Sequence, residues 1–211
     1  MIVSMLALSV SLALAYMIGS FPTSFILARA VKGVDIRQVG SGNAGATNVL
    51  RTVGKWPALV TLAVDLLKGV FAVTVLANVF YSFGIDLVFE FYQGLIGLVV
   101  VCGHIWSVFL KFKGGKGVAT TLGVALGITP MALLPTLAVW VSIFYLSSYV
   151  SLASIISLML FPLIACIMGY NFYTFMFGIA ICGISIYKHK ENVKRLLKGE
   201  ESKTKIFSKT K

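Results

Sequence analysis

Residues 118–187 read VATTLGVALGITPMALLPTLAVWVSIFYLSSYVSLASIISLMLFPLIACIMGYNFYTFMFGIAICGISIY, a run of 70 residues that holds no charged side chain. A transmembrane helix needs roughly 20 consecutive apolar residues to cross the hydrocarbon core of a bilayer. The run follows Lys116 and precedes Lys188, and Lys and Arg are enriched in cytoplasmic loops. Both ends are therefore expected on the cytoplasmic side, so that the run crosses the membrane an even number of times.

Breaks within this run divide it into four helical segments. The breaks are expected where proline, serine, glycine or asparagine interrupts the apolar pattern, at Pro130, Ser147–Ser148 and Gly169–Tyr170–Asn171. They predict segments near 118–128, 131–147, 151–168 and 172–187. The first segment is too short to cross alone, and we interpret it as a half-helix or as a segment that protein shields from lipid.

Three further apolar stretches precede the long run, at 1–28, 56–85 and 91–110. Asp65 and Lys68 are the only charged residues within these stretches. They stand at i and i+3 on one helix face, where they can pair. Together with the four later segments, these stretches predict an all-α fold, a polytopic integral membrane helical bundle of about seven transmembrane spans. We expect a structural pair rather than a direct substrate contact at Asp65 and Lys68.

The distribution of charge predicts the orientation of this bundle. Basic residues gather at 29–55, at 111–117 and in the C-terminal tail, which places these segments in the cytoplasm and the N-terminus outside. No Lys or Arg precedes Arg29, so the first span is expected to be uncleaved rather than a signal peptide. We expect a single transmembrane domain over residues 1–200 and a basic tail over 201–211, whose lysines lie at anionic membrane lipid.

Composition excludes other classes of protein. The 211 residues are 58% hydrophobic and 12% charged, with a mean hydropathy of +0.95 and a net charge of +11. A soluble domain could not bury this much apolar surface, and a disordered chain would carry less of it. A nucleic-acid-binding module would spread its basic charge among polar residues, so no nucleic-acid partner is expected. The three cysteines lie in apolar segments without metal-ligand spacing, and no metal is predicted.

The sequence SGNAGATN at 41–48, followed by Arg51, is the first candidate binding segment. Glycines allow backbone N–H groups to turn toward an anion, Ser, Thr and Asn add donors, and arginine can bind phosphate with two hydrogen bonds. The pattern fits a phosphate nest. It equally fits an ordinary turn in which Thr47 or Asn48 caps a helix.

The sequence FKGGKGVAT at 112–120 is the second candidate, with glycines on both sides of Lys116 at the start of an apolar helix. It is not a Walker A loop, because Gly117 stands where Ser or Thr is required, and ATP hydrolysis is not predicted. The alternative is a basic hairpin at lipid headgroups. His104 lies near the inner end of the preceding span, where it is either functional or held in an interhelical hydrogen bond.

The third segment is HKENVKRLLKGEE at 189–201. His189 and Asn192 stand at i and i+3, with Arg195 at i+6, and they can form a polar stripe that faces the bundle. Lys190, Lys194 and Lys198 form a separate basic stripe, which is typical of a surface at the headgroups.

These segments together resemble the bacterial membrane acyl-phosphate:glycerol-3-phosphate acyltransferases. The resemblance covers almost the whole chain and rests on four motifs in order: S-G-N-x-G-x-T-N at 41–48 with Arg51, Asp65-x-x-Lys68-Gly69, Gly103-His104 followed by F-x-G-G-K-G-V-A-T at 112–120, and His189-x-x-Asn192-x-x-Arg195-Leu196 with Gly199-x-Glu201. It implies transfer of a fatty acyl group from acyl phosphate to the 1-hydroxyl of glycerol 3-phosphate. The products are lysophosphatidic acid and inorganic phosphate, in the first acylation of phospholipid synthesis.

The resemblance also implies roles for individual residues in a multi-pass protein of the bacterial inner membrane, with the active site facing the cytoplasm. The catalytic candidates are Ser41, His189 and Asn192. The substrate-binding candidates are Gly42, Asn43, Gly45, Thr47, Asn48, Arg51, His104, Gly114, Gly115, Lys116, Gly117 and Glu201. Glu201 is expected to hold a loop or tail in place, and the general base is either His189 or a substrate phosphate. No cofactor is expected.

The acyl donor follows from a motif that the chain lacks. Other glycerolipid acyltransferases carry His-x-x-x-x-Asp and use acyl-CoA or acyl-carrier protein, whereas Phe109 stands five residues after His104. The resemblance therefore implies that neither carrier is required. The rival interpretation is a transporter or channel for an organic phosphate, which would also place cationic loops at broken helices. Polar segments at one face and the lack of an inverted repeat count against it.

Overall fold

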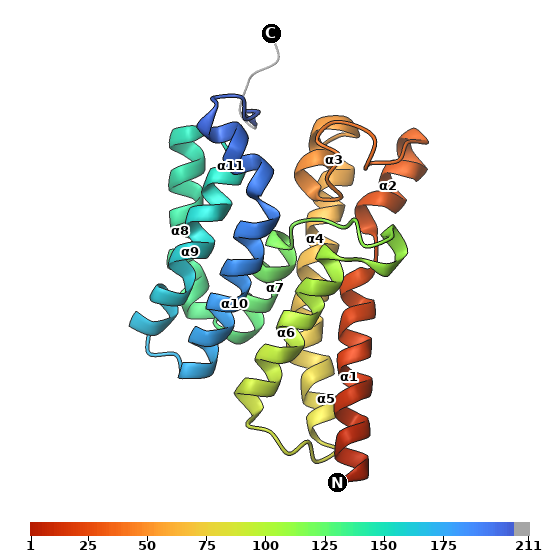
Figure 1. The fold of residues 1–211 in the computed structure, drawn as a ribbon, viewed down its shortest axis with the longest axis vertical. Coiled ribbons are helices and arrows are strands. Elements are labelled where there is room, and N and C mark those ends of the chain that lie inside the picture. Colours follow the sequence, from red (N-terminus) through yellow and green to blue (C-terminus); the bar gives the residue numbers. More distant parts are fainter. Residues whose placement is uncertain (205–211) are drawn as a thin grey trace. The chain divides into compact units, whose positions relative to one another are not determined.

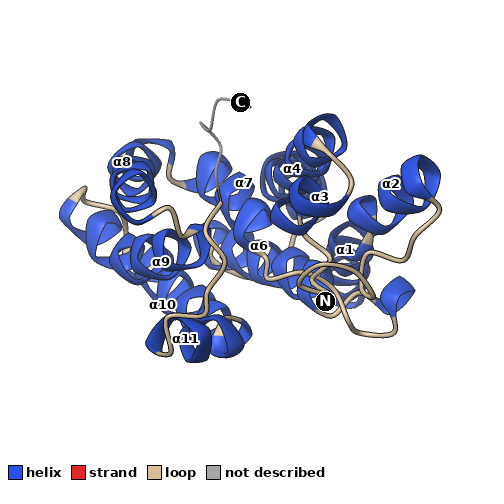
Figure 2. Cartoon of the chain, turned by 90° about the horizontal axis from the view of Figure 1, so that it is seen from above, coloured by secondary structure: helices blue, strands red, loops and turns tan. Residues whose placement is uncertain are grey.

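The structure is a computed structural model, and it describes residues 1–204. The described chain is built of helices joined by loops, with no strand among these residues (Figure 2). Its contacts divide it into two compact units, which meet in sequence at Pro130 and Met131. The all-helical prediction is confirmed. Residues 205–211 of the predicted basic tail lie outside the described residues, and the single domain over 1–200 stays a prediction.

The first unit contains seven α-helices (Figure 1). They are α1 (Ile2–Ser20), α2 (Thr23–Lys32), α3 (Ala46–Thr52), α4 (Lys55–Phe71), α5 (Ala77–Tyr81), α6 (Phe89–Ile105) and α7 (Val118–Ile128). A π-helical turn at Ala72–Leu76 joins α4 to α5, and a 3₁₀ turn at Val108–Leu110 follows α6.

Two pairs of helices pack closely in this unit because glycines face backbone at each crossing. At the α1–α6 crossing, a Cβ on Gly19 would collide with the Val100 carbonyl and one on Gly103 with the Tyr16 carbonyl. Small residues let helix backbones approach closely inside membranes, where burial of apolar surface drives little association. The close approach at this crossing places the inner end of α6, with His104, against α1.

The α4–α7 crossing is built in the same way. A Cβ on Gly69 would collide with the Thr120 carbonyl, and one on Gly123 with the Leu66 carbonyl. The short helix α7 is therefore covered along one side by α4, as the prediction of a shielded segment over 118–128 required. The same crossing holds the face of α4 that carries Lys68 inside the unit, where Lys68 is 7% exposed.

The second unit contains α8 (Pro130–Ser147), α9 (Val150–Ile167), α10 (Phe172–Lys188) and α11 (Lys190–Leu197). The predicted breaks are confirmed, since α8 begins at Pro130 and ends at Ser147. Asn171 caps α10 by accepting a hydrogen bond from the Thr174 N–H at 3.0 Å. The predicted boundaries of all four segments thus agree with the helices within one or two residues.

Five of the seven predicted spans are confirmed by length and composition. Within residues 1–204, five helical segments are long and apolar enough to cross a membrane, namely 2–32, 55–81, 89–110, 130–147 and 150–167. Helices α7 and α10 are shorter apolar helices. One difference concerns the first stretch, which was expected as one span over residues 1–28. The helix is interrupted at Phe21–Pro22 and restarts at Thr23, because proline lacks the N–H that would continue it.

Candidate functional site

The first glycine-rich loop is organised around the buried side chain of Asn48. Its Oδ1 accepts a hydrogen bond from the Ser41 N–H at 2.9 Å, and its Nδ2 donates to the carbonyls of Ile36 at 3.1 Å and Val39 at 3.0 Å. Gly40 supports this turn with a φ of 60° and passes so close to Asn48 that a Cβ there would collide with Oδ1. The contacts of Asn48 are therefore those of a residue that shapes the loop.

The capping alternative for this loop is wrong. The N-cap of α3 is Gly45, with no hydrogen bond from a side chain, and both Thr47 and Asn48 lie inside the helix. Asn43, Gly45 and Thr47 are half-buried, whereas Ser41 is exposed. The exposed residues of the segment also include Gly42 and Arg51.

The second glycine-rich loop folds back on the end of α6. The Gly114 N–H donates to the Ile105 carbonyl at 3.1 Å, and the Gly115 N–H donates to the His104 carbonyl at 3.1 Å. Gly117 then starts α7 with a φ of 82°, a left-handed conformation that favours glycine. Lys116 lies between Gly115 and Gly117 and is half-buried.

Gly115 is the point at which the two loops meet. A Cβ at Gly115 would collide with His104 Nε2 and would lie 2.9 Å from the carbonyl oxygen of Ala44 in the first loop. A glycine is therefore required for the second loop to touch the histidine and the first loop at once. The sequence motifs predicted each loop, and the structure joins them at His104.

An ion pair outside the spans ties the same two loops together. Arg37 holds Asp35 at 2.7 Å and donates through Nη1 to the Leu110 carbonyl at 3.0 Å. The hydrogen bonds from Arg37 lower the pKa of the Asp35 carboxyl below its ordinary value. The segment before the first loop is thus attached to the segment before the second.

A buried cluster of three ionisable side chains lies behind this junction. Lys68 Nζ is 2.7 Å from Asp65 Oδ1 on the same helix and 2.8 Å from His104 Nδ1 on α6. Asp65 is 2% exposed, Lys68 7% and His104 8%. The predicted Asp65–Lys68 pair is confirmed, and His104 is a third member that holds α4 to α6.

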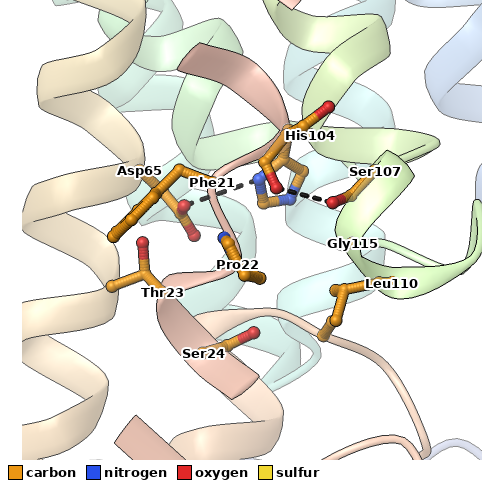
Figure 3. Close-up of a pocket in the computed structure, with 11 residues that line it drawn as sticks. Phe21, Pro22, Thr23, Ser24, Asp65, His104, Ser107, Leu110 and Gly115 are labelled. Atoms are coloured by element: carbon orange, nitrogen blue, oxygen red, sulfur yellow. Dashed lines mark hydrogen bonds and ion pairs between the residues drawn. The ribbon is translucent and has the colours of Figure 1, made fainter. Parts of the chain in front are cut away.

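Asp65 and His104 of this cluster form one wall of a small pocket in the first unit (Figure 3). Other walls come from the Phe21–Pro22 break, from Ser107 and from Gly115. Thr23 also lines the pocket, and its buried hydroxyl has no hydrogen-bond partner within the described chain. Ser107 donates to the Ser20 carbonyl at 2.5 Å and so fastens the α1 end to the segment after α6. The pocket thus joins polar side chains from the three predicted apolar stretches 1–28, 56–85 and 91–110.

The second unit holds the remaining predicted residues. His189 lies between α10 and α11 and is 2% exposed, with Nδ1 placed 2.7 Å from the Ser185 carbonyl. Asn192 Nδ2 donates to Glu201 Oε1 at 2.7 Å. Glu201 Oε1 also accepts from Ser151 Oγ at 2.7 Å. The predicted inward-facing stripe is confirmed for the two buried residues His189 and Asn192.

Glu201 ties the chain after α11 to helices α9 and α11. Besides its bonds with Ser151 and Asn192, its Oε2 accepts from Arg195 Nε at 2.7 Å. Burial alone would raise the pKa of the Glu201 carboxyl, but these three hydrogen bonds and the charge of Arg195 outweigh it and lower the pKa below the ordinary value. The contacts of Glu201 agree with the prediction that it holds a loop in place.

Sequence reasoning missed several polar residues of these clusters. Thr23, Ser107, Ser151 and Ser185 carry no motif of their own, and small hydroxyl side chains are common in membrane helices. A signal for the third partner of the Asp65–Lys68 pair did exist, since a lone histidine in an adjacent span requires a polar partner. Within residues 1–204, no group of three or more His, Cys, Asp or Glu side chains is placed to hold a metal ion.

The apolar helices and the polar junction at one end of the first unit define a polytopic helical membrane protein with a polar site. A family model described as glycerol-3-phosphate acyltransferase matches residues 9–199. The chain belongs to the glycerol-3-phosphate acyltransferase family. The match confirms the family resemblance that the four sequence motifs indicated.

Relatives extend over nearly the full length of the chain. It is 44% identical over 200 residues to the glycerol-3-phosphate acyltransferase of Desulforudis audaxviator (strain MP104C), covering 95% of this chain and 97% of the relative. It is 42% identical over 190 residues to the enzyme of the same name from Thermoanaerobacter pseudethanolicus (strain ATCC 33223 / 39E), covering 90% and 92%.

Two crystal structures of PlsY (YgiH), an integral membrane glycerol 3-phosphate acyltransferase, share the fold. The glycerol 3-phosphate form has a TM-score of 0.84 and 40% identity, covering 93% of this chain and 95% of PlsY. The lysophosphatidic acid form has a TM-score of 0.81 and 39% identity, covering 93% and 94%. The family and these structures favour acyl transfer over the alternative of a phosphate transporter.

Proposed function

We propose that this protein transfers a fatty acyl group from acyl phosphate to the 1-hydroxyl of glycerol 3-phosphate. The hydroxyl oxygen attacks the acyl carbon, the bond between that carbon and the phosphate oxygen breaks, and an ester forms. The hydroxyl proton passes to a base, and inorganic phosphate leaves with the bonding electrons. The products are lysophosphatidic acid and phosphate.

The observation that carries this proposal is the junction of the two glycine-rich loops at Gly115, against His104 and Ala44. Both substrates carry phosphate, and loops rich in glycine with nearby cations suit phosphate oxygens. Lys116 and Arg51 supply the positive charge in this role. Ser41, Gly42, Asn43, Gly45 and Thr47 supply donors in the first loop, and Gly114, Gly115 and Gly117 in the second. Asn48 acts by shaping the first loop.

His189 and Asn192 orient the reacting hydroxyl in this proposal. If His189 is neutral and donates Nδ1–H to the Ser185 carbonyl, its Nε2 carries the lone pair that a general base requires. A phosphate oxygen of a substrate is the other candidate base. Asn192 is held by Glu201, which keeps its side chain in one orientation.

The acyl donor and the orientation follow from chemistry and charge. An acyl phosphate is a mixed anhydride with a good leaving group, so neither acyl-CoA nor acyl-carrier protein is required, and the chain lacks the His-x-x-x-x-Asp motif at His104. The site faces the cytoplasm in this proposal, because both glycine-rich loops lie in basic segments. The protein thus acts in the bacterial inner membrane.

The test is to purify the protein in detergent, add palmitoyl phosphate and glycerol 3-phosphate, and measure phosphate release together with lysophosphatidic acid. We expect both products in equal amounts, and none when palmitoyl-CoA replaces palmitoyl phosphate. Lack of product from protein that is folded by circular dichroism would contradict the proposal. Product from palmitoyl-CoA alone would contradict the assigned donor.

A further inference from the structure

The cluster of Lys68, Asp65 and His104 lies on helices α4 and α6, outside the loops that bind phosphate in the proposed function. Lys68 Nζ is 2.8 Å from His104 Nδ1, and Asp65 Oδ1 is 2.7 Å from the same ammonium group. All three side chains are at most 8% exposed. Such a costly burial of charge inside a membrane protein is typical of a functional arrangement.

The hydrogen-bond chemistry of lysine restricts the state of His104. An ammonium group has three donors and no acceptor, so a ring nitrogen at hydrogen-bond distance from it must accept. The ion pair with Asp65 at 2.7 Å favours the charged ammonium form of Lys68. Nδ1 of His104 therefore carries no proton, and the proton of the neutral ring lies on Nε2.

The other side of the ring faces the junction of the two loops. A Cβ on Gly115 would collide with His104 Nε2, and the same position lies 2.9 Å from the Ala44 carbonyl. Figure 3 shows His104 between Asp65 and the loop that carries Gly115. The Nε2–H group is thus presented on the side where the proposed function places phosphate.

We infer that Lys68 and Asp65 are positioning residues that hold His104 in its Nε2–H tautomer, so that it presents a neutral hydrogen-bond donor to the phosphate-binding junction. The role in substrate affinity rests on the proposed function, whereas the tautomer itself does not. His104 is held as a donor rather than as a base, because its accepting nitrogen is already occupied by Lys68.

Replacing Lys68 with methionine should reverse the tautomer of His104. Without the ammonium group, the nearest partner of His104 Nδ1 in the cluster is Asp65 Oδ1, at 3.5 Å. This carboxylate oxygen is a hydrogen-bond acceptor. The ring then gains by moving its proton to Nδ1, and Nε2 becomes an acceptor that repels phosphate oxygens. The loss of one hydrogen bond to a charged group raises a KM by roughly tenfold or more.

The first experiment is ¹⁵N NMR of the histidine rings in detergent-solubilised protein. The chain has 2 histidines, so His104→Gln assigns the signals by loss. For wild-type protein we expect a pyrrole-type Nε2 and a pyridine-type Nδ1 at His104. A protonated Nδ1, in either the other tautomer or the imidazolium, would overturn the inference, and this measurement requires no variant that alters the cluster.

The second experiment compares Lys68→Met with Lys68→Arg and with Lys55→Met, a control at an exposed lysine of the same helix. We expect Lys68→Met to exchange the two ring signals and to raise the KM of a phosphate-bearing substrate roughly tenfold, with a smaller change in kcat. Lys68→Arg keeps a donor and should keep the wild-type tautomer, and Lys55→Met should change neither readout.

The outcomes separate the two proposals. An exchanged tautomer with unchanged KM values for both substrates would overturn the role of His104 as a donor to phosphate. An unexchanged tautomer in folded Lys68→Met would overturn the positioning role of Lys68. If wild-type protein shows the expected tautomer but forms no lysophosphatidic acid, the proposed function fails while the assigned tautomer stands.

Discussion

The two histidines of the chain are held at Nδ1 by partners of opposite hydrogen-bond character. His104 in the first unit faces the Lys68 ammonium, a donor, at 2.8 Å. His189 in the second unit faces the Ser185 carbonyl, an acceptor, at 2.7 Å. In their neutral forms the two rings are therefore opposite tautomers, with the proton on Nε2 in His104 and on Nδ1 in His189.

Burial alone does not define the chemical role of a histidine. Both rings are at most 8% exposed, yet one presents a donor and the other a lone pair at Nε2. A donor suits a phosphate oxygen, whereas a lone pair suits the hydroxyl proton of an acyl acceptor. Under the proposed function, the comparison therefore favours binding for His104, and it favours His189 over His104 if the base is a histidine.

Replacing His189 has the largest expected effect, and it tests directly whether the two histidines have different roles. If His189 is the general base, His189→Ala should lower kcat by roughly 10²–10⁴, with a smaller change in KM. His104→Gln should act mainly on KM, because its proposed role is binding. Steady-state kinetics with both substrates measures the two effects, and a loss of only a few-fold in His189→Ala would assign the proton to a substrate phosphate.

Adding a methyl group at Gly115 tests the His104 side of the comparison. Gly115→Ala forces His104 Nε2 or the Ala44 carbonyl to move, and a displacement of about 1 Å in a binding site can cost about a hundredfold in activity. Gly183→Ala is the matched control, because no atom lies within 4 Å of its added Cβ. Equal activities of the two variants would show that the loop junction does not serve the reaction.

Removing the cation of the second loop should have an intermediate effect. Lys116→Ala removes a charged hydrogen-bond donor from the proposed phosphate site, and we expect the KM for glycerol 3-phosphate to rise roughly tenfold. The exposed neighbour Lys113 provides the control variant Lys113→Ala. An unchanged KM in Lys116→Ala would remove this residue from the glycerol 3-phosphate site.

The smallest expected effect concerns the support of Asn192 in the second unit. Glu201→Gln replaces an acceptor of three hydrogen bonds and should destabilise the folded protein by about 1–3 kcal/mol. Thermal unfolding in detergent at neutral pH measures the change. Glu200→Gln, at the exposed adjacent position, should leave the melting temperature unchanged.

The same carboxyl predicts a dependence of stability on pH. Because hydrogen bonding lowers the pKa of Glu201 in the folded protein, its contribution is present above the ordinary value of 4.5 and is lost as the pH falls through the lower folded value. The melting temperatures of wild-type and Glu201→Gln protein should therefore converge on acidification. A difference that persists unchanged to the lowest pH would contradict this source of stability.

Sequence patterns predicted the spans well because crossing a bilayer is a local requirement. Each apolar segment satisfies its own backbone hydrogen bonds, and Pro130 and Asn171 stop helices through local chemistry. The interruption at Phe21–Pro22 was missed because hydropathy continues through it. The glycine-rich loops were found for the same local reason, since their composition is visible in a short window.

The candidate site was predicted as separate motifs, and its internal contacts were not. His104 and Lys68 are 36 residues apart, and nothing in either motif states which helix faces which. Asn48 was expected to bind substrate, yet its three hydrogen bonds shape the loop. A polar side chain looks the same in sequence whether its partner is a ligand or a backbone carbonyl.

The helical membrane class and the two cation-bearing loops could be predicted from the amino-acid sequence, because hydropathy and composition act over a single helix or turn. The contact of Lys68 with the Nδ1 of His104 depends on tertiary structure, because the two residues lie on different helices. The partner of the His189 Nδ1 is local, since the Ser185 carbonyl lies four residues earlier on α10. The tautomer of a histidine depends on the one atom that lies about 3 Å from each ring nitrogen. For His104 that atom comes from another helix, and close packing places it there.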